Sequence, residues 1–173
     1  MQVLERKYPT KVGSNGIVRR EYEYIRHGTA ALLAAFNVRT GTVFGKVVAQ
    51  RTADATVDFM EQVASHYRQK SVYVIWDNLN THYDGKDNRW TNFNARHGGR
   101  FHFIYTPLHA SWMNQVECWF SILHRRILRH GSFDSEQALR KIVEAFIDHW
   151  NEQECHPFRW TWRTDKLHNR KHA

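Results

Sequence analysis

Two acidic side chains stand in contexts that could support chemistry, and the first is Asp77. It ends the run VYVIWD, in which the five apolar or aromatic residues 72–76 lead directly into the carboxylate. A short continuous apolar run is typical of a buried strand in a parallel sheet, and ligands gather at the carboxyl ends of such strands. Asp77 is therefore either a functional carboxylate or a residue that only caps the following turn.

The second acidic side chain is Glu117, within SWMNQVECWFSILHRRILRH. We predict a helix here from Ser111, a candidate N-cap, to about His130. Its apolar stripe is formed by Val116, Phe120, Leu123 and Ile127. Glu117 falls beside that stripe, where it could face the sheet edge. The alternative is a solvated glutamate near a helix N-terminus, where the helix dipole favours negative charge.

An aspartate at a strand end and a glutamate on a helix would together suit Mg²⁺ or Mn²⁺. Mg²⁺ is usually held by one or two carboxylates with phosphate oxygens and water. Two such ions about 3.5–4 Å apart can activate the attacking oxygen and stabilise the departing one in phosphodiester cleavage. Bridging two ions normally needs a third carboxylate. The candidates lie in loops or helix entries, which favour that role only weakly: Asp54, Asp58, Asp84 and Asp87.

Basic residues follow Glu117 in the segment HRRILRH, which contains no acidic residue. Arg125 and Arg129 are one helical turn apart, with Arg126 between them, and this spacing suits phosphate contacts. A solvated basic face is the alternative. The whole chain carries 25 Lys and Arg against 17 Asp and Glu, a net charge of +8, which favours a polyanionic partner such as nucleic acid. Trp160 and Trp162 either stack on bases or cover the core.

Other functional classes find little support in the sequence. The two cysteines, Cys118 and Cys155, have no CxxC spacing, and no glycine-rich phosphate loop or GxSxG motif is present. No segment approaches the roughly 20 apolar residues of a membrane span, and the first residues lack the apolar region of a signal peptide. We therefore expect a cytoplasmic protein with no membrane partner.

The elements that must position these residues follow from hydrophobic periodicity and turn signals. Residues 1–26 read as an irregular loop. After it we predict a β-hairpin (29–38 and 42–49), a helix (54–69), a strand (71–77), a helical segment within 84–99, a strand (101–105) and two helices (111–130 and 134–151). No linker divides the chain, so residues 1–173 are expected to form one domain. The order of elements predicts an α/β fold with a mixed sheet flanked by helices.

Three stretches of the sequence together resemble a known family: IWDNLNTH, FHFIYTPLHASWMNQVECWFSILHRR and FRWTW. They resemble the catalytic domain of DDE transposases, specifically the mariner-like insertion-sequence 630 family, and RREYEYIRHGTAALLAAFNVRTGTVFGKV resembles that family's second and third strands. The resemblance implies an RNase H-like fold. It also implies an Asp, Asp and Glu site with two Mg²⁺ or Mn²⁺ ions, which nicks double-stranded DNA at transposon ends and joins it to a target, and a homodimer in the active complex.

Residue by residue, Asp77 matches the second acidic ligand of the family and Glu117 the third. The resemblance gives three neighbours a supporting role, in orienting ligands or contacting DNA: Asn78, His82 and Asn114. The first catalytic aspartate of the family ends its first strand in a D-E-x-x-x-Q type motif. MQVLERKYP resembles the family's segment just after that motif, and Glu5 stands in a different context.

These departures lead us to expect a partial domain without its first strand and without an upstream helix-turn-helix region. Such a chain would be a weak or inactive transposase unless a second chain, for example one encoded upstream, supplies the missing part. Two alternatives stay open. One is a catalytically dead remnant that binds DNA, and the other is an RNase H-like metal-dependent nuclease with a substitute carboxylate.

Overall fold

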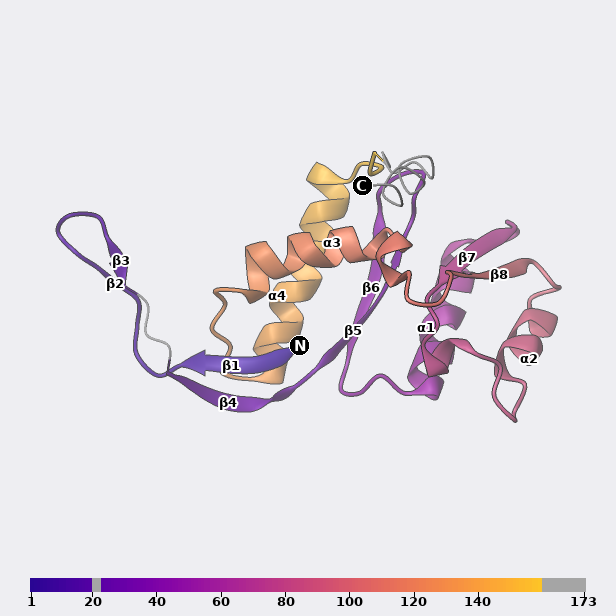
Figure 1. The fold of residues 1–173 in the computed structure, drawn as a ribbon, viewed down its shortest axis with the longest axis horizontal. Coiled ribbons are helices and arrows are strands. Elements are labelled where there is room, and N and C mark those ends of the chain that lie inside the picture. Colours follow the sequence, from indigo (N-terminus) through magenta and orange to yellow (C-terminus); the bar gives the residue numbers. More distant parts are fainter. Residues whose placement is uncertain (20–22, 160–173) are drawn as a thin grey trace, which may run out of the picture.

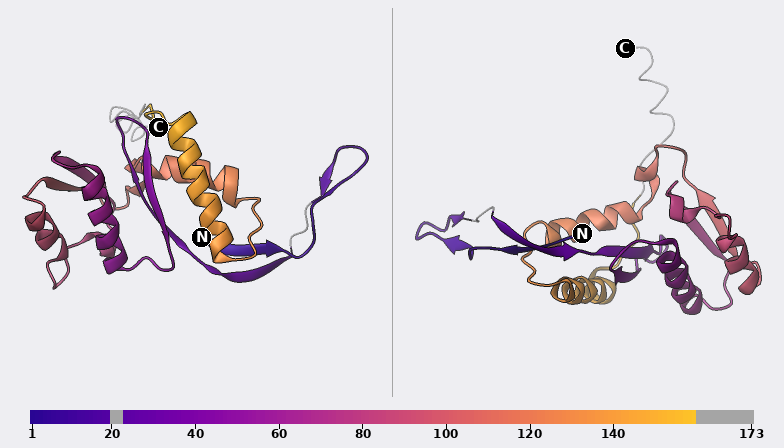
Figure 2. Two further views of the ribbon diagram at one scale, coloured as in Figure 1. Left: turned by 180° about the vertical axis from the view of Figure 1, so that it is seen from behind. Right: turned by 90° about the horizontal axis from the view of Figure 1, so that it is seen from below.

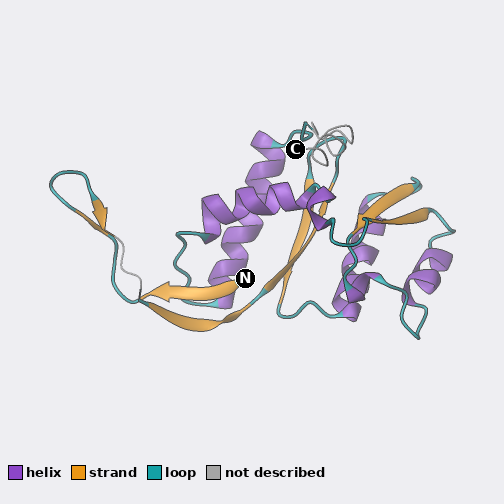
Figure 3. Cartoon of the chain, in the orientation of Figure 1, coloured by secondary structure: helices purple, strands orange, loops and turns teal. Residues whose placement is uncertain are grey.

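A computed structural model describes residues 1–19 and 23–159 of the chain, so Trp160 and Trp162 lie outside the described residues. The molecule is elongated, with a narrow strand arm at one end and a helix-covered pair of strands at the other (Figure 1). In the rest of the described chain a strand pair is followed by helices and strands in turn, and then by helical segments alone (Figure 3). The predicted α/β class is confirmed.

The first part of the chain forms four strands, so the prediction of an irregular loop for residues 1–26 is wrong. They are β1 (Gln2–Arg6), β2 (Lys11–Val12), β3 (Val18–Arg19) and β4 (Tyr24–Thr29). β1 pairs antiparallel with β4, and β2 with β3. In β1 only Val3 is fully buried, at 0% exposure. The apolar signal of these strands is therefore weak, and their pairing depends on backbone contacts between distant residues.

The predicted hairpin is present as β5 (Ala31–Phe36) and β6 (Val43–Val48), which pair antiparallel. Val43 and Val47 of β6 are buried in a core that also contains Trp119, Leu139 and Trp150. That core is completed by α4 (Glu136–His149), which Ser135 caps by accepting a hydrogen bond from the backbone N–H of Ala138. In the right-hand view of Figure 2, where the strands are seen edge-on, α3 lies on one side of the strands and α4 on the other.

A second core holds the two strands nearest the candidate site. Here α1 (Ala53–His66) begins after the N-cap Thr52, and α2 (Arg89–Arg96) lies beside it. β7 (Val72–Trp76) and β8 (Phe101–Tyr105) pair in parallel, with Trp76 opposite Tyr105. Their alternate side chains pack against the two helices, in a cluster that includes Phe59, Trp76, Trp90, Phe93 and Phe101. Both predicted strands and α1 are thereby confirmed.

The predicted continuous mixed sheet is not formed by residues 1–19 and 23–159. The described strands make four separate two-stranded sheets, of which β5–β6 is antiparallel and β7–β8 is parallel. Each of these two pairs has the predicted direction, but no hydrogen-bonded strand joins them. They pack mainly into different cores, the first against α3 and α4 and the second against α1 and α2.

The predicted helix over residues 111–130 is broken into three pieces. A 3₁₀ turn, η2 (Ser111–Met113), precedes α3 (Val116–Leu123), which continues as the π-helical η3 (His124–Leu128). The N-cap position of α3 is Gln115, so the predicted cap at Ser111 is wrong. Trp119, which the predicted stripe omitted, is 0% exposed. The final helix α4 is confirmed and ends in the π-helical η4 (Trp150–Glu154).

Candidate active site at the carboxyl ends of β7 and β8

Asp77 directly follows β7, at the edge of the sheet where β8 also ends. The backbone N–H of Thr106 donates to the carbonyl of Trp76 at 2.8 Å, which extends the parallel ladder by one residue and brings Thr106 next to Asp77. His82 Nδ1 lies 2.8 Å from Asp77 Oδ1. The His82 ring also stacks on Trp76, with centroids 4.8 Å apart. The imidazole therefore braces the carboxylate against the buried end of the strand.

Asn78 ties the loop after β7 to the loop after β8. Its Nδ2 donates to the carbonyl of Thr106 at 2.8 Å, and its Oδ1 accepts a hydrogen bond from the Tyr83 hydroxyl. Tyr83 stacks on Tyr105 at 5.0 Å, and the Tyr105 hydroxyl donates to the His82 carbonyl at 2.6 Å. These contacts hold the two loops together around Asp77.

Glu117 lies in the first turn of α3, an element far from Asp77 in the sequence. Its backbone N–H donates to the Asn114 carbonyl at 3.0 Å, and Asn114 Oδ1 accepts from the backbone N–H of Val116 at 3.4 Å. Burial, and then the nearby charge of Asp77, raise the pKa of the Glu117 carboxyl above its usual value. The structure thus brings Asp77 and Glu117 within electrostatic reach of each other, and places Asn114 at the start of the helix that carries Glu117.

Buried polar atoms without hydrogen-bond partners concentrate around this site. Within the described residues, five buried side-chain atoms have none, and four of them lie in the segments that follow β7 and β8: Asp77 Oδ1, Thr81 Oγ1, Thr106 Oγ1 and Gln115 Oε1. The close contact between Asp77 Oδ1 and His82 does not have hydrogen-bond geometry, so that oxygen keeps unused acceptor capacity. Because buried polar groups are normally paired, such a concentration indicates a place for an ion or ligand.

A pocket of about 220 Å³ opens beside Asp77, lined by Asp77, Asn78, Leu79, Thr106 and His109. Sequence reasoning missed Thr106 and His109. They flank Pro107 and Leu108 in the stretch TPLHASW, and this position after a strand was the only signal available. Neither residue type is diagnostic of a site by itself, whereas the folded chain places both in the wall of one pocket.

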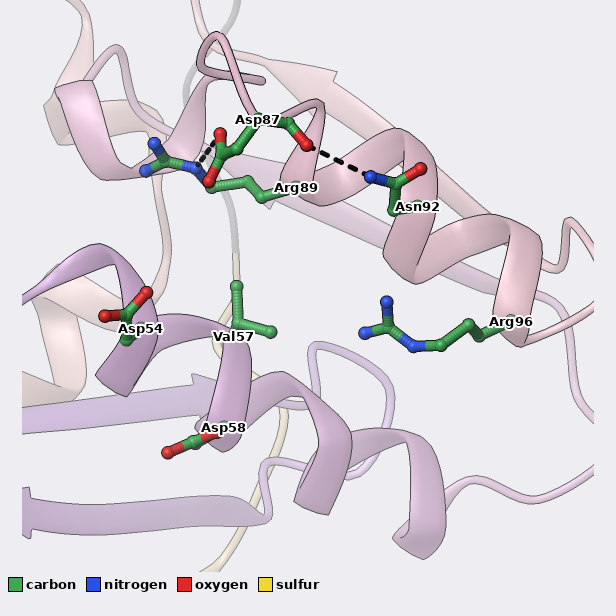
Figure 4. Close-up of a pocket in the computed structure, with 7 residues that line it drawn as sticks. All are labelled: Asp54, Val57, Asp58, Asp87, Arg89, Asn92 and Arg96. Carbon is green, nitrogen blue, oxygen red and sulfur yellow. Dashed lines mark hydrogen bonds and ion pairs between the residues drawn. The ribbon is translucent and has the colours of Figure 1, made fainter.

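A larger pocket of about 340 Å³ lies between α1 and α2 and contains most of the weak candidates for a third carboxylate (Figure 4). Its lining residues are Asp54, Val57, Asp58, Asp87, Arg89, Asn92 and Arg96. Asp84 has another task, since it accepts hydrogen bonds from the backbone N–H groups of Trp90 and Thr91 at the start of α2. Within the described part of the chain, no group of three or more His, Cys, Asp or Glu could hold a metal ion.

The three arginines predicted to contact DNA are exposed on η3 and just after it. Arg126 forms an ion pair with Glu154 of η4, and its guanidinium lies over the Phe146 ring at 5.2 Å. Arg125 and Arg129 have no side-chain hydrogen bond or ion pair with any described residue. Arg126 therefore joins two helical segments, and the other two arginines are the more available for phosphate contacts.

Comparison with known proteins decides the family. Residues 2–140 match the family model described as DDE superfamily endonuclease. The chain belongs to this family. A curated relative, the uncharacterized 39 kDa protein of insertion element IS630 from Shigella sonnei, is 31% identical over 85 residues, which are 49% of this chain and 24% of that protein. The match thus spans about a quarter of the relative's length. No solved structure matches the chain significantly.

As a DDE superfamily endonuclease, the chain belongs to a superfamily that generally uses divalent metal ions. The residues present fit such an ion. Asp77 Oδ1 is buried and, despite its contact with His82, accepts no hydrogen bond from a described residue, and the charge of Asp77 raises the pKa of Glu117. Two carboxylates are enough protein ligands for Mg²⁺ when phosphate and water complete its shell.

No helix of residues 1–19 and 23–159 is long and apolar enough to cross a membrane.

Proposed function

We propose that this DDE superfamily endonuclease is the catalytic part of an insertion-sequence transposase, which cleaves and transfers DNA strands at transposon ends on an RNase H-like fold. The observation that carries the proposal is the match of residues 2–140 to the DDE superfamily endonuclease family, and the place of Asp77 at the carboxyl end of the parallel strand β7, with Glu117 nearby, supports it. Two acids from distant parts of the chain are held together there, although their charges repel. A divalent cation accounts for that arrangement, because it stabilises both carboxylates in their charged form.

In this proposal Asp77 and Glu117 would hold Mg²⁺ or Mn²⁺, and such an ion would supply Lewis-acid chemistry for phosphodiester cleavage. His82 fixes the orientation of the Asp77 carboxylate, and Asn78 holds together the loops that follow β7 and β8. Asn114 anchors the first turn that carries Glu117. Arg125 and Arg129 contact DNA phosphates, with a smaller contribution from Arg126 because Glu154 already pairs with it.

A site for two ions needs a further carboxylate from outside the described residues. In the active complex we propose that it comes from another segment or chain, with a homodimer bringing two DNA ends together. Where no such carboxylate is supplied, cleavage by the 173-residue chain is weak or absent.

The test is metal-dependent nicking of supercoiled plasmid DNA by the purified chain, alone and with any upstream-encoded segment added. Asp77→Asn and Glu117→Gln are expected to abolish nicking in Mg²⁺ or Mn²⁺. The matched control is Asp58→Asn, which removes a carboxylate from the larger pocket between α1 and α2 and should leave nicking unchanged. Nicking that survives both site substitutions would rule out this site.

The second candidate function is DNA binding without catalysis, and the missing third carboxylate among the described residues favours it. Here the basic chain binds duplex DNA through Arg125, Arg129 and other exposed cations. The logarithm of affinity should then fall linearly with the logarithm of salt concentration. Binding without nicking, even with any upstream-encoded segment added, supports this function, whereas an affinity that does not respond to salt argues against phosphate contacts.

A further inference from the structure

We propose that Thr106 and His109 form a phosphate subsite beside Asp77, which binds a phosphodiester group of the DNA strand. The inference rests on the proposed function for its DNA ligand. Its structural basis is the 220 Å³ pocket that both residues line together with Asp77, Asn78 and Leu79.

Thr106 supplies the first observation. The residue is only 7% exposed, and its backbone is fixed on both sides, because its N–H donates to Trp76 and its carbonyl accepts from Asn78. Its hydroxyl oxygen is nevertheless buried without a hydrogen-bond partner among the described residues. An unpaired buried hydroxyl is unfavourable for folding. A rigidly held residue that keeps one in the wall of a pocket is therefore placed to bind a ligand.

His109 supplies a second, independent observation. Its φ is +62°, in the left-handed region that residues with a Cβ rarely adopt. Strained backbone of this kind concentrates at functional sites, where the surrounding structure enforces it. His109 is exposed and lines the same pocket as Thr106. The ring offers an N–H donor in every protonation state.

The remaining groups of the pocket indicate which ligand fits. Both polar ends of the Asn78 side chain are already bonded, to the Thr106 carbonyl and the Tyr83 hydroxyl. The uncommitted side-chain donors are thus the Thr106 hydroxyl and the His109 ring, a pair suited to an anionic oxygen. The pocket volume of about 220 Å³ leaves room for several water molecules, each of which occupies about 30 Å³ in the liquid. It is smaller than the roughly 300–1,000 Å³ of sites for drug-sized ligands, so it suits a phosphate group better than a nucleoside.

Because the Asp77 carboxylate lines the same pocket, its negative charge should affect how strongly the subsite binds a phosphate. Its negative charge repels a phosphate, so binding by the wild-type chain should need a divalent cation. Asp77→Asn removes that charge and nearly preserves the shape. This variant should therefore bind a phosphodiester in EDTA, where the wild type does not.

The experiment is a two-dimensional NMR titration of the full 173-residue chain. The probes are dimethyl phosphate, inorganic phosphate and a short DNA duplex, each in Mg²⁺ and in EDTA. We expect dimethyl phosphate and duplex DNA to shift the Thr106 amide and the His109 ring signals, in the wild type with Mg²⁺ and in Asp77→Asn with EDTA. A response to inorganic phosphate alone would overturn the proposal, because it would reveal a free-anion site.

Two substitutions test the donors while leaving the fold intact. Thr106→Val removes an unpaired hydroxyl at constant shape, and should weaken binding about tenfold or more without lowering Tm. Its matched control is Thr29→Val, on the exposed strand β4. His109→Gly relieves the positive φ and should weaken binding without lowering Tm. Its matched control is Gln69→Gly, which relieves a φ of +57° after α1, outside the pocket lining.

The outcomes separate this inference from the proposed function. Wild-type affinity in both Thr106→Val and His109→Gly overturns the subsite, even if nicking still depends on Asp77 and Glu117. Binding that is lost only in proportion to lost Tm also overturns it, since both residues would then be structural. If the subsite binds as expected but nicking is independent of Asp77 and Glu117, the subsite stands and the proposed metal site fails.

Discussion

The two pockets described above differ in the burial of their unpaired polar groups. In the larger one, between α1 and α2, Arg89 pairs with Asp87 at 3.0 Å (Figure 4). Arg96, which also lines it, pairs with Glu61 at 2.7 Å. In the smaller one, beside Asp77, one carboxylate oxygen of Asp77 and the hydroxyl oxygen of Thr106 are buried and form no hydrogen bond with a described residue. Size alone would favour the larger pocket. The buried atoms without hydrogen bonds favour the smaller one, because the carboxylates of Asp54 and Asp58 in the larger pocket are exposed and can be solvated without a ligand.

The largest expected difference between the pockets is the response of stability to metal. At a concentration of Mg²⁺ or Mn²⁺ about 100 times the dissociation constant, a single site should stabilise the fold by about 2.7 kcal/mol. Thermal unfolding with and without metal measures this gain. It should vanish in the double variant Asp77→Asn, Glu117→Gln, and persist in Asp54→Asn, Asp58→Asn. An equal loss in both double variants would mean that metal binds in both pockets.

The next effect concerns the histidine that braces Asp77. His82→Ala removes the contact at 2.8 Å to Asp77 Oδ1 and the stacking on Trp76. Partners of metal ligands typically contribute 10–100-fold to affinity, so the Mn²⁺ dissociation constant should rise by about that factor. Arg89→Ala is the control, because it breaks a comparable contact in the larger pocket. If the two variants bind Mn²⁺ equally well, His82 has no positioning role.

The contrast between the pockets also explains which parts of the site were predictable from the sequence. Asp77 was marked by the apolar run before it, and Glu117 by its place beside a helical stripe, because both signals are local. Thr106 and His109 carried no comparable signal. Their significance depends on an unpaired hydroxyl and a positive φ, which exist only once the loops after β7 and β8 are folded against each other.

In the fold too, elements marked by local sequence patterns were predicted, and pairings between distant residues were not. The hairpin β5–β6, the strands β7 and β8, and the helices α1 and α4 follow from patterns within each segment. The pairing of β1 with β4 was missed because it joins residues about twenty positions apart through their backbones. The continuous sheet was predicted from the order of elements, but element order does not specify which strand edges meet, and β5 and β7 are not paired.

A smaller effect is expected at Asp84, which caps the helix that forms one wall of the larger pocket. Burial opposes ionisation, but hydrogen bonds from Thr91 and from the backbone N–H of Trp90 prevail and lower the pKa of Asp84 below its usual value. Its stabilising contribution is therefore complete above the ordinary aspartate pKa and is lost as pH falls through the lowered one. Asp84→Ala should cost about 1 kcal/mol at neutral pH.

Chemical denaturation across a pH series measures this contribution. The difference in unfolding free energy between wild type and Asp84→Ala should shrink in acid. A difference that stays constant with pH would mean that the cap on α2 does not depend on the charged form of Asp84.

The smallest effect is expected in the larger pocket itself, at the ion pair between Arg96 and Glu61. Burial raises the pKa of Glu61, but Arg96 and His97 outweigh that effect and hold it below its usual value. The pair is largely exposed, with side chains 55% and 38% accessible, so Arg96→Met should cost less than about 1 kcal/mol. DNA binding and metal-dependent nicking should both be unchanged. If Arg96→Met instead weakened DNA binding as strongly as Thr106→Val, the ion pairs of the larger pocket would be part of a DNA site, and unpaired polar atoms would no longer distinguish the two pockets.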